Sequence, residues 1–508
     1  MLVSFLGCHS TETSHFDTFL NANSNHEFSL LITNALVYDG SGSEAIEADV
    51  LLRGNEIAFV GLVDTSLIII EKVIDAQGKV LSPGFIDAHA HGNPFRTPEF
   101  KNFLAMGVTS ICLGQDGSSP ARDIVSWINQ VDSIDIALNI IPFVGHGTIR
   151  MASGTKYQLE PSAIQLDAMT DMLQEAFDVG CFGMSTGLEY TPGVYAQAEE
   201  MAALAKVVGK NDGIIMSHIR NEDDDAVEES LLELLAQGDF CNVHAAHLKV
   251  VYGKGAERAD QILELLFNRE SDYNITADVY PYTASYTGIS IVFPAWSKPP
   301  NDYEAVKTNK KEELLEFLRN KIQQRNGPEA TLFGTARYAG LTLAQLSKAQ
   351  GRPYEEILMD IGPGGASGAY FIMNEPLQEK LYQHPKVMLS SDGSPTMRHP
   401  RGYGSFAKAI EEYVFQDSLY TLAEAIHKMT GLTAQTLGIT DRGLIKAGYK
   451  ADLLIFDPLE IKANATYPEP HQLASGFDCV IVNGILSKEK NVFLSKNAGE
   501  VLKKLTIQ

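Results

Sequence analysis

The chain has 508 residues, of which 44% are hydrophobic and 20% are charged, a composition typical of a globular protein with a large apolar core. Its 64 acidic residues outnumber its 40 lysines and arginines, and the formal net charge of −24 disfavours nucleic acid and anionic lipid as partners. No stretch approaches the roughly 20 apolar residues of a membrane-spanning helix, so we expect no transmembrane span. The sequence indicates no particular oligomeric state.

Residues 1–27 are expected to form a separate N-terminal segment. Phe5-Leu6-Gly7-Cys8 resembles the lipobox at which bacterial lipoproteins are cleaved and acylated, and a polar tether would follow it. The apolar run before Cys8 is short and lacks a basic residue, so a chance match is equally compatible with the sequence. A true lipobox would make the protein periplasmic or lipid-anchored, and a chance match would leave it cytoplasmic.

The other cysteines are scattered without CxxC spacing, which predicts neither a disulfide framework nor a thiolate zinc site. We expect them to be buried as small hydrophobic residues; they are Cys112, Cys181, Cys241 and Cys479.

Residues 28–80 contain short stretches of alternating apolar and polar residues separated by turn residues, a pattern typical of β-strands. A matching pattern returns over residues 440–490. Two segments so far apart in the chain can pair into one structural unit. The sequence therefore predicts a small β-sandwich domain built from both segments.

Between them, residues 81–439 alternate short apolar runs with amphipathic stretches such as 162–180 and 197–211. Repeated alternation of strand and helix predicts an α/β fold of the TIM-like (β/α)8 barrel type. The stretch 285–334 is too long for a plain loop, and we expect it to form an inserted lid or subdomain.

The first candidate metal ligands lie in the stretch GFIDAHAHG, where His89 and His91 follow an apolar strand. Residues two apart on a strand project to the same side, so the two imidazoles can hold one divalent metal. A lone HxH pair is a weak signal. Its position at the end of the first predicted barrel strand strengthens it, because barrel active sites lie at the carboxyl ends of strands.

Three further candidates occur in the same context: His218, His247 and Asp392 each end a short apolar run typical of a buried parallel strand. Each one alone is more often a core histidine or a helix-capping aspartate. Together with the HxH pair they would converge on one barrel mouth, which favours a metal site.

These stretches resemble the amidohydrolase superfamily, and further motifs are similar to the N-acyl-D-amino-acid deacylase (D-aminoacylase) family. The resemblance runs from about Ile32 to Gly484. The motifs, in chain order, are GVTSICLGQDG, PFVGHGTIR, GMSTGLEYTPG, SHIRNE, AHLKV, DVYPYTAS, SSDGSP, RHPRGYGSF, DRGLIKAGYKADLLIFD and FDCVIVNG.

The resemblance implies one or two Zn2+ ions per subunit. His89, His91 and Asp392 would form one site, and two more histidines would contribute to a neighbouring one, namely His218 and His247. Asp116 stands where the family motif has a metal-binding cysteine. A carboxylate can also ligate zinc, so we expect Asp116 to be a ligand.

The implied reaction is hydrolysis of the amide bond of an N-acyl-D-amino acid, a small molecule, to give a carboxylate and a free D-amino acid. Asp392 would be the catalytic residue that takes a proton from water and returns it to the leaving amine. Lys249, Tyr280 and Arg401 would bind the α-carboxylate of the substrate. His146 and Glu189 are expected either beside the mouth or in a purely structural role.

Two alternatives stay open. The first is another amidohydrolase that acts on a cyclic amide or a dipeptide, of the dihydroorotase, hydantoinase or isoaspartyl dipeptidase type. Those branches commonly use a carboxylated lysine, and no lysine lies between Gly107 and Pro120. The second is a binding protein that has lost catalysis, which the complete set of candidate ligands disfavours.

Overall fold

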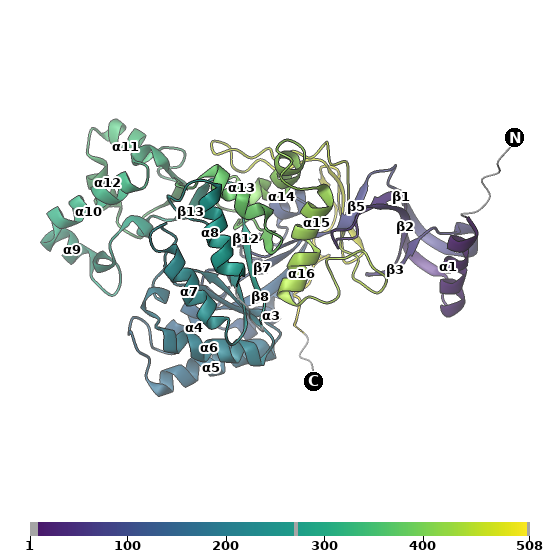
Figure 1. Cartoon of the computed structure of the whole chain (residues 1–508), viewed down its shortest axis with the longest axis horizontal. Helices are drawn as coiled ribbons and strands as arrows, with labels where there is room; N and C mark the ends of the chain where they lie inside the picture. The colour runs from purple at the N-terminus through teal and green to yellow at the C-terminus, as the bar shows by residue number, and fades with distance from the viewer. Residues whose placement is uncertain (1–8, 269–272, 505–508) are drawn as a thin grey trace.

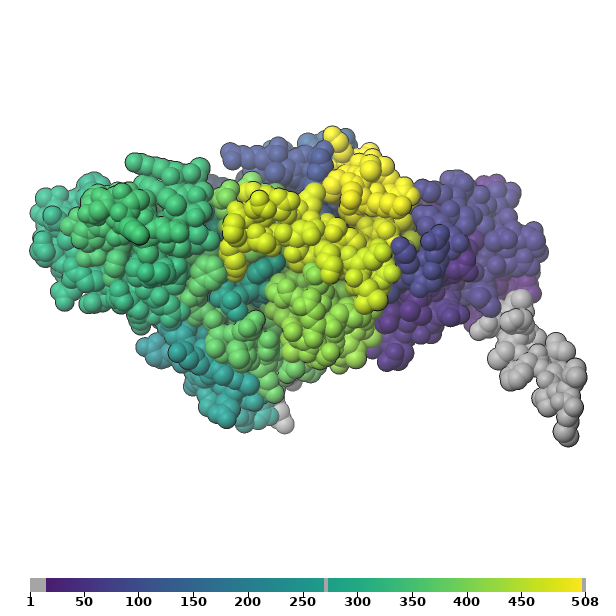
Figure 2. Space-filling view, turned by 90° about the horizontal axis from the view of Figure 1, so that it is seen from above, coloured from purple at the N-terminus to yellow at the C-terminus, as the bar shows by residue number. Residues whose placement is uncertain are grey.

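The computed structural model describes residues 9–268 and 273–504. The molecule is elongated, with a barrel in the middle, a mixed β-sheet at one end and a smaller subdomain at the other (Figure 1). The C-terminal part of the chain lies between the subdomain and the N-terminal sheet in the space-filling view (Figure 2). Cys8 and its lipobox-like neighbours lie outside the described residues.

Eight parallel strands form the barrel, in the order β16-β12-β11-β10-β9-β8-β7-β6. Their inward side chains make one apolar cluster that includes Cys112, Phe143 and Met216. The strands are β6 (Phe85–Asp87), β7 (Val108–Leu113), β8 (Asn139–Gly145), β9 (Gly183–Gly187), β10 (Ile214–His218), β11 (Asn242–Ala245), β12 (Ile275–Val279) and β16 (Val387–Leu389).

Hydrogen bonds just beyond the first and last strands bring the barrel close to full closure. Ala90 and Gly393 form a parallel bridge, and the backbone N–H of Asp392 donates to the carbonyl of His89 at 2.8 Å. The loops after β6 and β16 are thereby held side by side. The expected TIM-like barrel is confirmed.

Helices surround the barrel and bury their apolar faces against the outside of its strands in the largest hydrophobic cluster. A capping box of Ser162 and Gln165 fixes the start of α5. The helices are α2 (Lys101–Ala105), α3 (Ile124–Val131), α4 (His146–Ala152), α5 (Ala163–Asp178), α6 (Ala198–Lys210), α7 (Val227–Gln237), α8 (Ala256–Phe267), α13 (Glu375–Gln383), α14 (Arg401–Lys408), the π-helix η6 (Ala409–Val414), α15 (Leu422–Met429) and α16 (Gly431–Leu437).

N- and C-terminal strands share one mixed nine-stranded sheet, as the sequence predicts. Strand β5 joins the two parts, since it pairs parallel with β1 and antiparallel with β17. The order is β20-β19-β18-β17-β5-β1-β2-β3, with β4 also beside β1. The strands are β1 (Glu27–Val37), β2 (Ile46–Arg53), β3 (Glu56–Gly61), β4 (Ile69–Asp75), β5 (Val80–Pro83), β17 (Leu453–Phe456), β18 (Phe477–Val482), β19 (Ile485–Glu489) and β20 (Val492–Phe493).

A helix, α1 (His9–Ala22), packs on this sheet where the sequence suggested a tether. Phe16 is 1% exposed and lies in an apolar cluster with Leu31 and Phe59. The ring centroids of Phe16 and Phe59 are 5.1 Å apart in an edge arrangement. Among the described helices none has the length and apolarity needed to cross a bilayer.

The segment between β12 and β16 carries a separate subdomain, called the lid below. Its three-stranded antiparallel sheet and four helices enclose a hydrophobic cluster of their own. The lid contains β13 (Ala284–Gly288), α9 (Tyr303–Asn309), α10 (Lys311–Gln324), β14 (Thr331–Phe333), α11 (Leu343–Gln350), α12 (Tyr354–Ile361) and β15 (Ser367–Phe371).

Candidate metal centre

Six side chains predicted as metal ligands meet at the carboxyl-end mouth of the barrel. Each one ends a barrel strand or lies in the loop directly after it, where parallel strands bring their loops together. They are His89 and His91 after β6, Asp116 after β7, His218 at the end of β10, His247 after β11 and Asp392 after β16.

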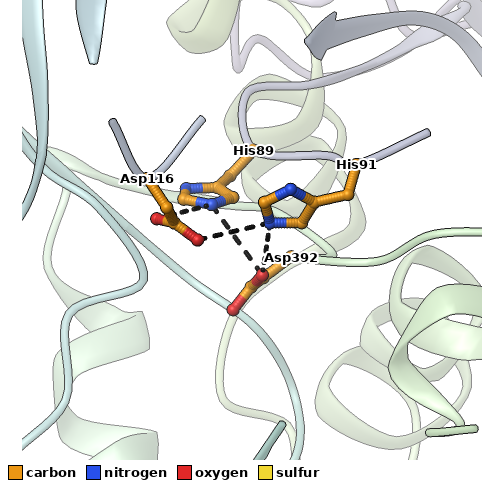
Figure 3. A group of neighbouring side chains, drawn as sticks. All are labelled: His89, His91, Asp116 and Asp392. Atoms are coloured by element: carbon orange, nitrogen blue, oxygen red, sulfur yellow. Dashed lines mark hydrogen bonds and ion pairs between the residues drawn. The ribbon is translucent and has the colours of Figure 1, made fainter. Parts of the chain in front are cut away.

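The first group of ligand atoms comes from four residues (Figure 3). The Nε2 atoms of His89 and His91 each lie 3.4 Å from an oxygen of Asp116. The Oδ1 atom of Asp392 is 3.8 Å from His89 Nε2 and 3.2 Å from His91 Nε2. One ligand atom from each residue fits within 4.8 Å of all the others.

A second group shares Asp116 with the first. His218 Nδ1 and His247 Nε2 are 3.0 Å apart, and they lie 3.8 and 3.3 Å from Asp116 Oδ1. Asp116 therefore stands between two pairs of imidazoles, with Oδ2 toward His91 and Oδ1 toward the other three. One carboxylate could therefore supply a ligand oxygen to either group.

The surroundings of His89 provide a test of whether a metal fits. The ring is fully buried, and neither of its nitrogens has a hydrogen-bond partner among the described residues. Burial lowers the pKa of His89, which favours the neutral imidazole that a metal requires. A buried polar ring that lacks a partner is costly, so the donor set fits a divalent ion such as zinc.

The backbone holds three ligand positions in the left-handed region. The φ angles of Asp116, His247 and Asp392 are 54°, 38° and 46°. This conformation is uncommon outside glycine and costs about 1–3 kcal/mol per residue. Such positions cluster at functional sites, where the surrounding structure keeps side chains aimed at a common point.

Two buried carboxylates below the ligands hold the loops in place. Asp278 accepts hydrogen bonds from the backbone N–H of His247 at 2.9 Å and from the ring of His244 at 2.6 Å. Burial raises the pKa of Asp278, but the hydrogen bond from His244 and the charges of the nearby histidines together outweigh burial, and the pKa falls to about 2. Asp87 accepts from the backbone N–H of His89 at 3.2 Å, and burial raises its pKa to about 7.

The three residues predicted to bind the substrate carboxylate lie beside the ligands and are buried. Lys249 Nζ donates to Glu222 at 2.6 Å and contacts His247 Nδ1 at 2.8 Å. Arg401 Nη1 lies 2.9 Å from Asp392 Oδ2. The ring of Tyr280 lies between the two cations, 5.8 Å from Lys249 Nζ and 4.5 Å from Arg401 Cζ.

Most of these residues border one cavity of about 1190 Å³ between the barrel mouth and the lid. Glu189 lies at this mouth, where its Oε2 is 3.0 Å from His218 Nε2. His146 does not join the ligands, because it pairs with Glu200, which also pairs with Arg150, in a fully buried cluster.

The sequence reasoning did not identify Glu222, Asp278 or the lid residue Arg325, although all three contact or border the site. Glu222 follows His218 within the stretch SHIRNE, which is the one signal that could have pointed to it.

Comparison with known proteins agrees with the fold and the site. Residues 319–486 match the amidohydrolase family model. The chain is 30% identical to an N-acyl-D-aspartate deacylase of Alcaligenes xylosoxydans xylosoxydans, over 89% of this chain and 91% of the relative.

Two solved structures are similar over 94% of this chain and 100% of their own. One is an N-acyl-D-glutamate deacylase from Bordetella bronchiseptica, complexed with zinc and a phosphonate that mimics the tetrahedral intermediate, with a TM-score of 0.80 at 28% identity. The other is a D-aminoacylase with a binuclear metal centre, described as showing one-metal activation and second-metal attenuation, with a TM-score of 0.79 at 27% identity.

A parallel barrel that gathers histidines and carboxylates at its mouth, together with these similarities, defines a metal-dependent amidohydrolase. Within that superfamily, the chain belongs to the D-aminoacylase family.

Proposed function

We propose that this protein is a zinc-dependent deacylase that hydrolyses the amide bond of N-acyl-D-amino acids, giving a carboxylate and a free D-amino acid. The observation that carries the proposal is Asp116, which lies between two pairs of imidazoles at the floor of a cavity with buried cations in its wall. The D-amino-acid derivatives named in the relatives support the substrate class.

Zinc would be held by the two groups described above, with Asp116 contributing to both. When bound, zinc polarises the amide carbonyl and lowers the pKa of water. The number of ions, one or two, depends on how firmly each group holds its ion; the similar D-aminoacylase is described as showing one-metal activation and second-metal attenuation.

Asp392 is the residue we assign to proton transfer. Burial raises the pKa of its carboxyl, but the charge of Arg401 and the hydrogen bond with His91 outweigh burial and hold the pKa below its usual range. Asp392 is therefore ionised at neutral pH and able to accept a proton from the attacking water. It then returns that proton to the nitrogen of the leaving amine.

Arg401 and Tyr280 keep donors available for the α-carboxylate of the substrate. Nη1 of Arg401 pairs with Asp392, and Nη2 donates to the carbonyl of Tyr286 at 3.2 Å. Its buried Nε has no partner within the described part of the chain, and neither has the hydroxyl of Tyr280. One free guanidinium N–H and one free hydroxyl suit a carboxylate, and Lys249 adds a second positive charge.

A substrate screen tests the proposal. Purified protein is incubated with N-acetyl-D-amino acids, their L-enantiomers, dihydroorotate, a hydantoin and an isoaspartyl dipeptide, and released amine or acid is measured. We expect the protein to hydrolyse the D-substrates. A chelator that removes the metal should abolish this activity, and added zinc should restore it. Turnover only of a cyclic amide or of the dipeptide would assign the site to another reaction of the superfamily.

A further inference from the structure

The lid contributes one buried cation to the same cavity, Arg325, which directly follows helix α10. The residue is 3% exposed. Its backbone N–H donates to the carbonyls of Lys321 and Ile322, both at 3.0 Å, so the end of the helix fixes its position. The proposed chemistry at the metal centre does not use Arg325.

Arg325 differs from the other cations of the cavity wall. Lys249 and Arg401 are buried too, but each forms an ion pair with a carboxylate. Arg122 and Lys156 stand at the rim, where water solvates them. Arg325 takes part in none of the ion pairs formed by the described residues, and its buried Nε has no hydrogen-bond partner there.

The neighbours of Arg325 do not neutralise its charge. Its guanidinium carbon lies 5.1 Å from the centre of the Tyr370 ring, and Tyr252 lies beside it. Asp223 borders the cavity nearby, but Lys321, one turn earlier on α10, already pairs with it at 3.1 Å. An aromatic face compensates a buried cation only partly, so the site lacks an anion.

We infer that Arg325, a buried cavity-lining guanidinium without a carboxylate partner, receives a second anionic group of the substrate. Burying a charge without a counter-charge is expensive, and a carboxylate can bind a guanidinium through two parallel hydrogen bonds. The inference rests on the proposed deacylase function and narrows its substrates to N-acyl-D-amino acids that carry a carboxylate besides the α-carboxylate.

The place of Arg325 separates this group from the α-carboxylate. Arg325 borders the cavity on the lid side, as do Val251 and Ile372. Tyr280 and Arg401, in contrast, lie beside Asp392. The cavity, at about 1190 Å³, is larger than the few hundred Å³ that bind many small ligands. The second carboxylate can belong to the amino-acid side chain or to the far end of the acyl chain.

Matched substrate pairs distinguish these two sources. N-acetyl-D-glutamate is compared with N-acetyl-D-glutamine, which differs only by a neutral amide on the side chain. N-succinyl-D-alanine is compared with N-butanoyl-D-alanine, which has an apolar acyl end. For each pair kcat/KM is measured, and we expect the acid to exceed its neutral partner by roughly 10- to 100-fold in at least one pair, the range for hydrogen bonds to a charged group.

Arg325→Met tests the assignment, because methionine fills a similar volume without charge. This variant should lose most of the acid preference while its kcat/KM for the neutral partner stays within about threefold of the original protein. Arg325→Lys keeps a charge but not the paired donors, and it should retain part of the preference. The control is Arg319→Met on helix α10, because Arg319 pairs with Glu355 outside the cavity lining and is half exposed.

The inference fails if the unaltered protein treats both members of each pair alike, or if Arg325→Met loses acidic and neutral substrates equally. If no N-acyl amino acid is hydrolysed at all, the proposed function fails first. Thermal shifts with glutarate and with butyrate as probes then decide the binding question. Stabilisation by glutarate that Arg325→Met abolishes would support an anion site, and equal shifts with both probes would overturn it.

Discussion

The sequence predicts Asp116 as a ligand in place of a cysteine, and its surroundings explain how a carboxylate can serve there. Its two oxygens face different histidines, so one side chain reaches both groups of candidate ligands. Burial raises the pKa of Asp116, but its contacts with the neighbouring histidines together hold that pKa well below its usual value, which keeps the carboxylate ionised. A carboxylate is a harder ligand than a thiolate and discriminates less between divalent ions.

Substitutions of Asp116 test its role as a ligand. Asp116→Ala should lose bound metal and activity together, whereas Asp116→Cys should keep zinc and part of the turnover. Metal content by elemental analysis and kcat are measured on the same samples. Asp116→Asn separates ligation from turn formation, because an amide can still cap backbone N–H groups. Full metal content and near-normal rate in the Asn variant would make Asp116 a turn residue only.

Asp392→Asn tests proton transfer with almost no change in shape. We expect kcat to fall by at least about 10²-fold, the usual loss when a general base is removed. Metal content is measured alongside, since Asp392 also lies within reach of His89 and His91. If the variant keeps its metal but loses turnover, the missing proton acceptor explains the loss. A rate within a few-fold of the original would assign the proton to another group.

Arg401→Met tests recognition of the α-carboxylate. Because the free Nε–H of Arg401 would bind that carboxylate, KM for N-acyl-D-amino acids should rise by roughly 10- to 100-fold. The corresponding α-amides lack the negative charge, so their KM should change much less. Arg401 also pairs with Asp392, and the split between KM and kcat shows which contact dominates. An equal rise in KM for acids and amides would show that Arg401 does not bind the α-carboxylate.

At the scale of elements, the loops after the strands place the ligands, and their backbone allows little variation. The turn after β7 passes through Gly114 and Gly117, with φ angles of 100° and 75° around Asp116. A Cβ on Gly117 would lie 2.8 Å from the backbone nitrogen of Gly187, at the end of β9. Glycine at this position therefore lets two neighbouring loops approach closely, which sets the depth of Asp116 in the mouth.

Gly117→Ala should displace the Asp116 loop and weaken metal binding, because backbone atoms of β9 cannot move aside as a side chain can. Zinc affinity is measured by competition with a chelator. Gly78→Ala is the matched control, since Gly78 has a similar φ of 77° with nothing within 4 Å of the added Cβ. Both variants carry the left-handed strain, so only the clash differs. Equal zinc affinity in the two would mean that the close approach has no effect on the site.

At the scale of the whole molecule, the sequence predicted those parts of the fold that rest on a regular pattern of strands and helices. Alternating strands and helices indicated the barrel, and the matching strand patterns at both ends indicated the sheet that β5 and β17 complete. The ligands could be predicted as a group because carboxyl ends of parallel strands converge whatever the loops do.

Other features depend on tertiary contacts that no local pattern records. Helix α1 has a mostly polar sequence, and its stability comes from burying Phe16 and Leu20 on the sheet. The pairing of Lys249 with Glu222 joins two loops that follow different strands. Arg325 stands out only when its burial and the pairing of its neighbours are known together, since its sequence context is that of an ordinary helix end.

The metal centre also bears on the stability of the whole barrel, because its ligands come from five strand ends that the chain reaches over 304 residues, from His89 to Asp392 counted inclusively. An ion that binds only the folded state stabilises it by about 2.7 kcal/mol at a free concentration 100 times its dissociation constant. Chelation should therefore lower the melting temperature by about 2–3 °C and abolish turnover, and added zinc should restore both. The Asp116→Ala variant supplies the control, since its melting temperature should respond much less to chelator. Identical melting curves with and without zinc, together with full activity in metal-free protein, would contradict a resident metal at this mouth.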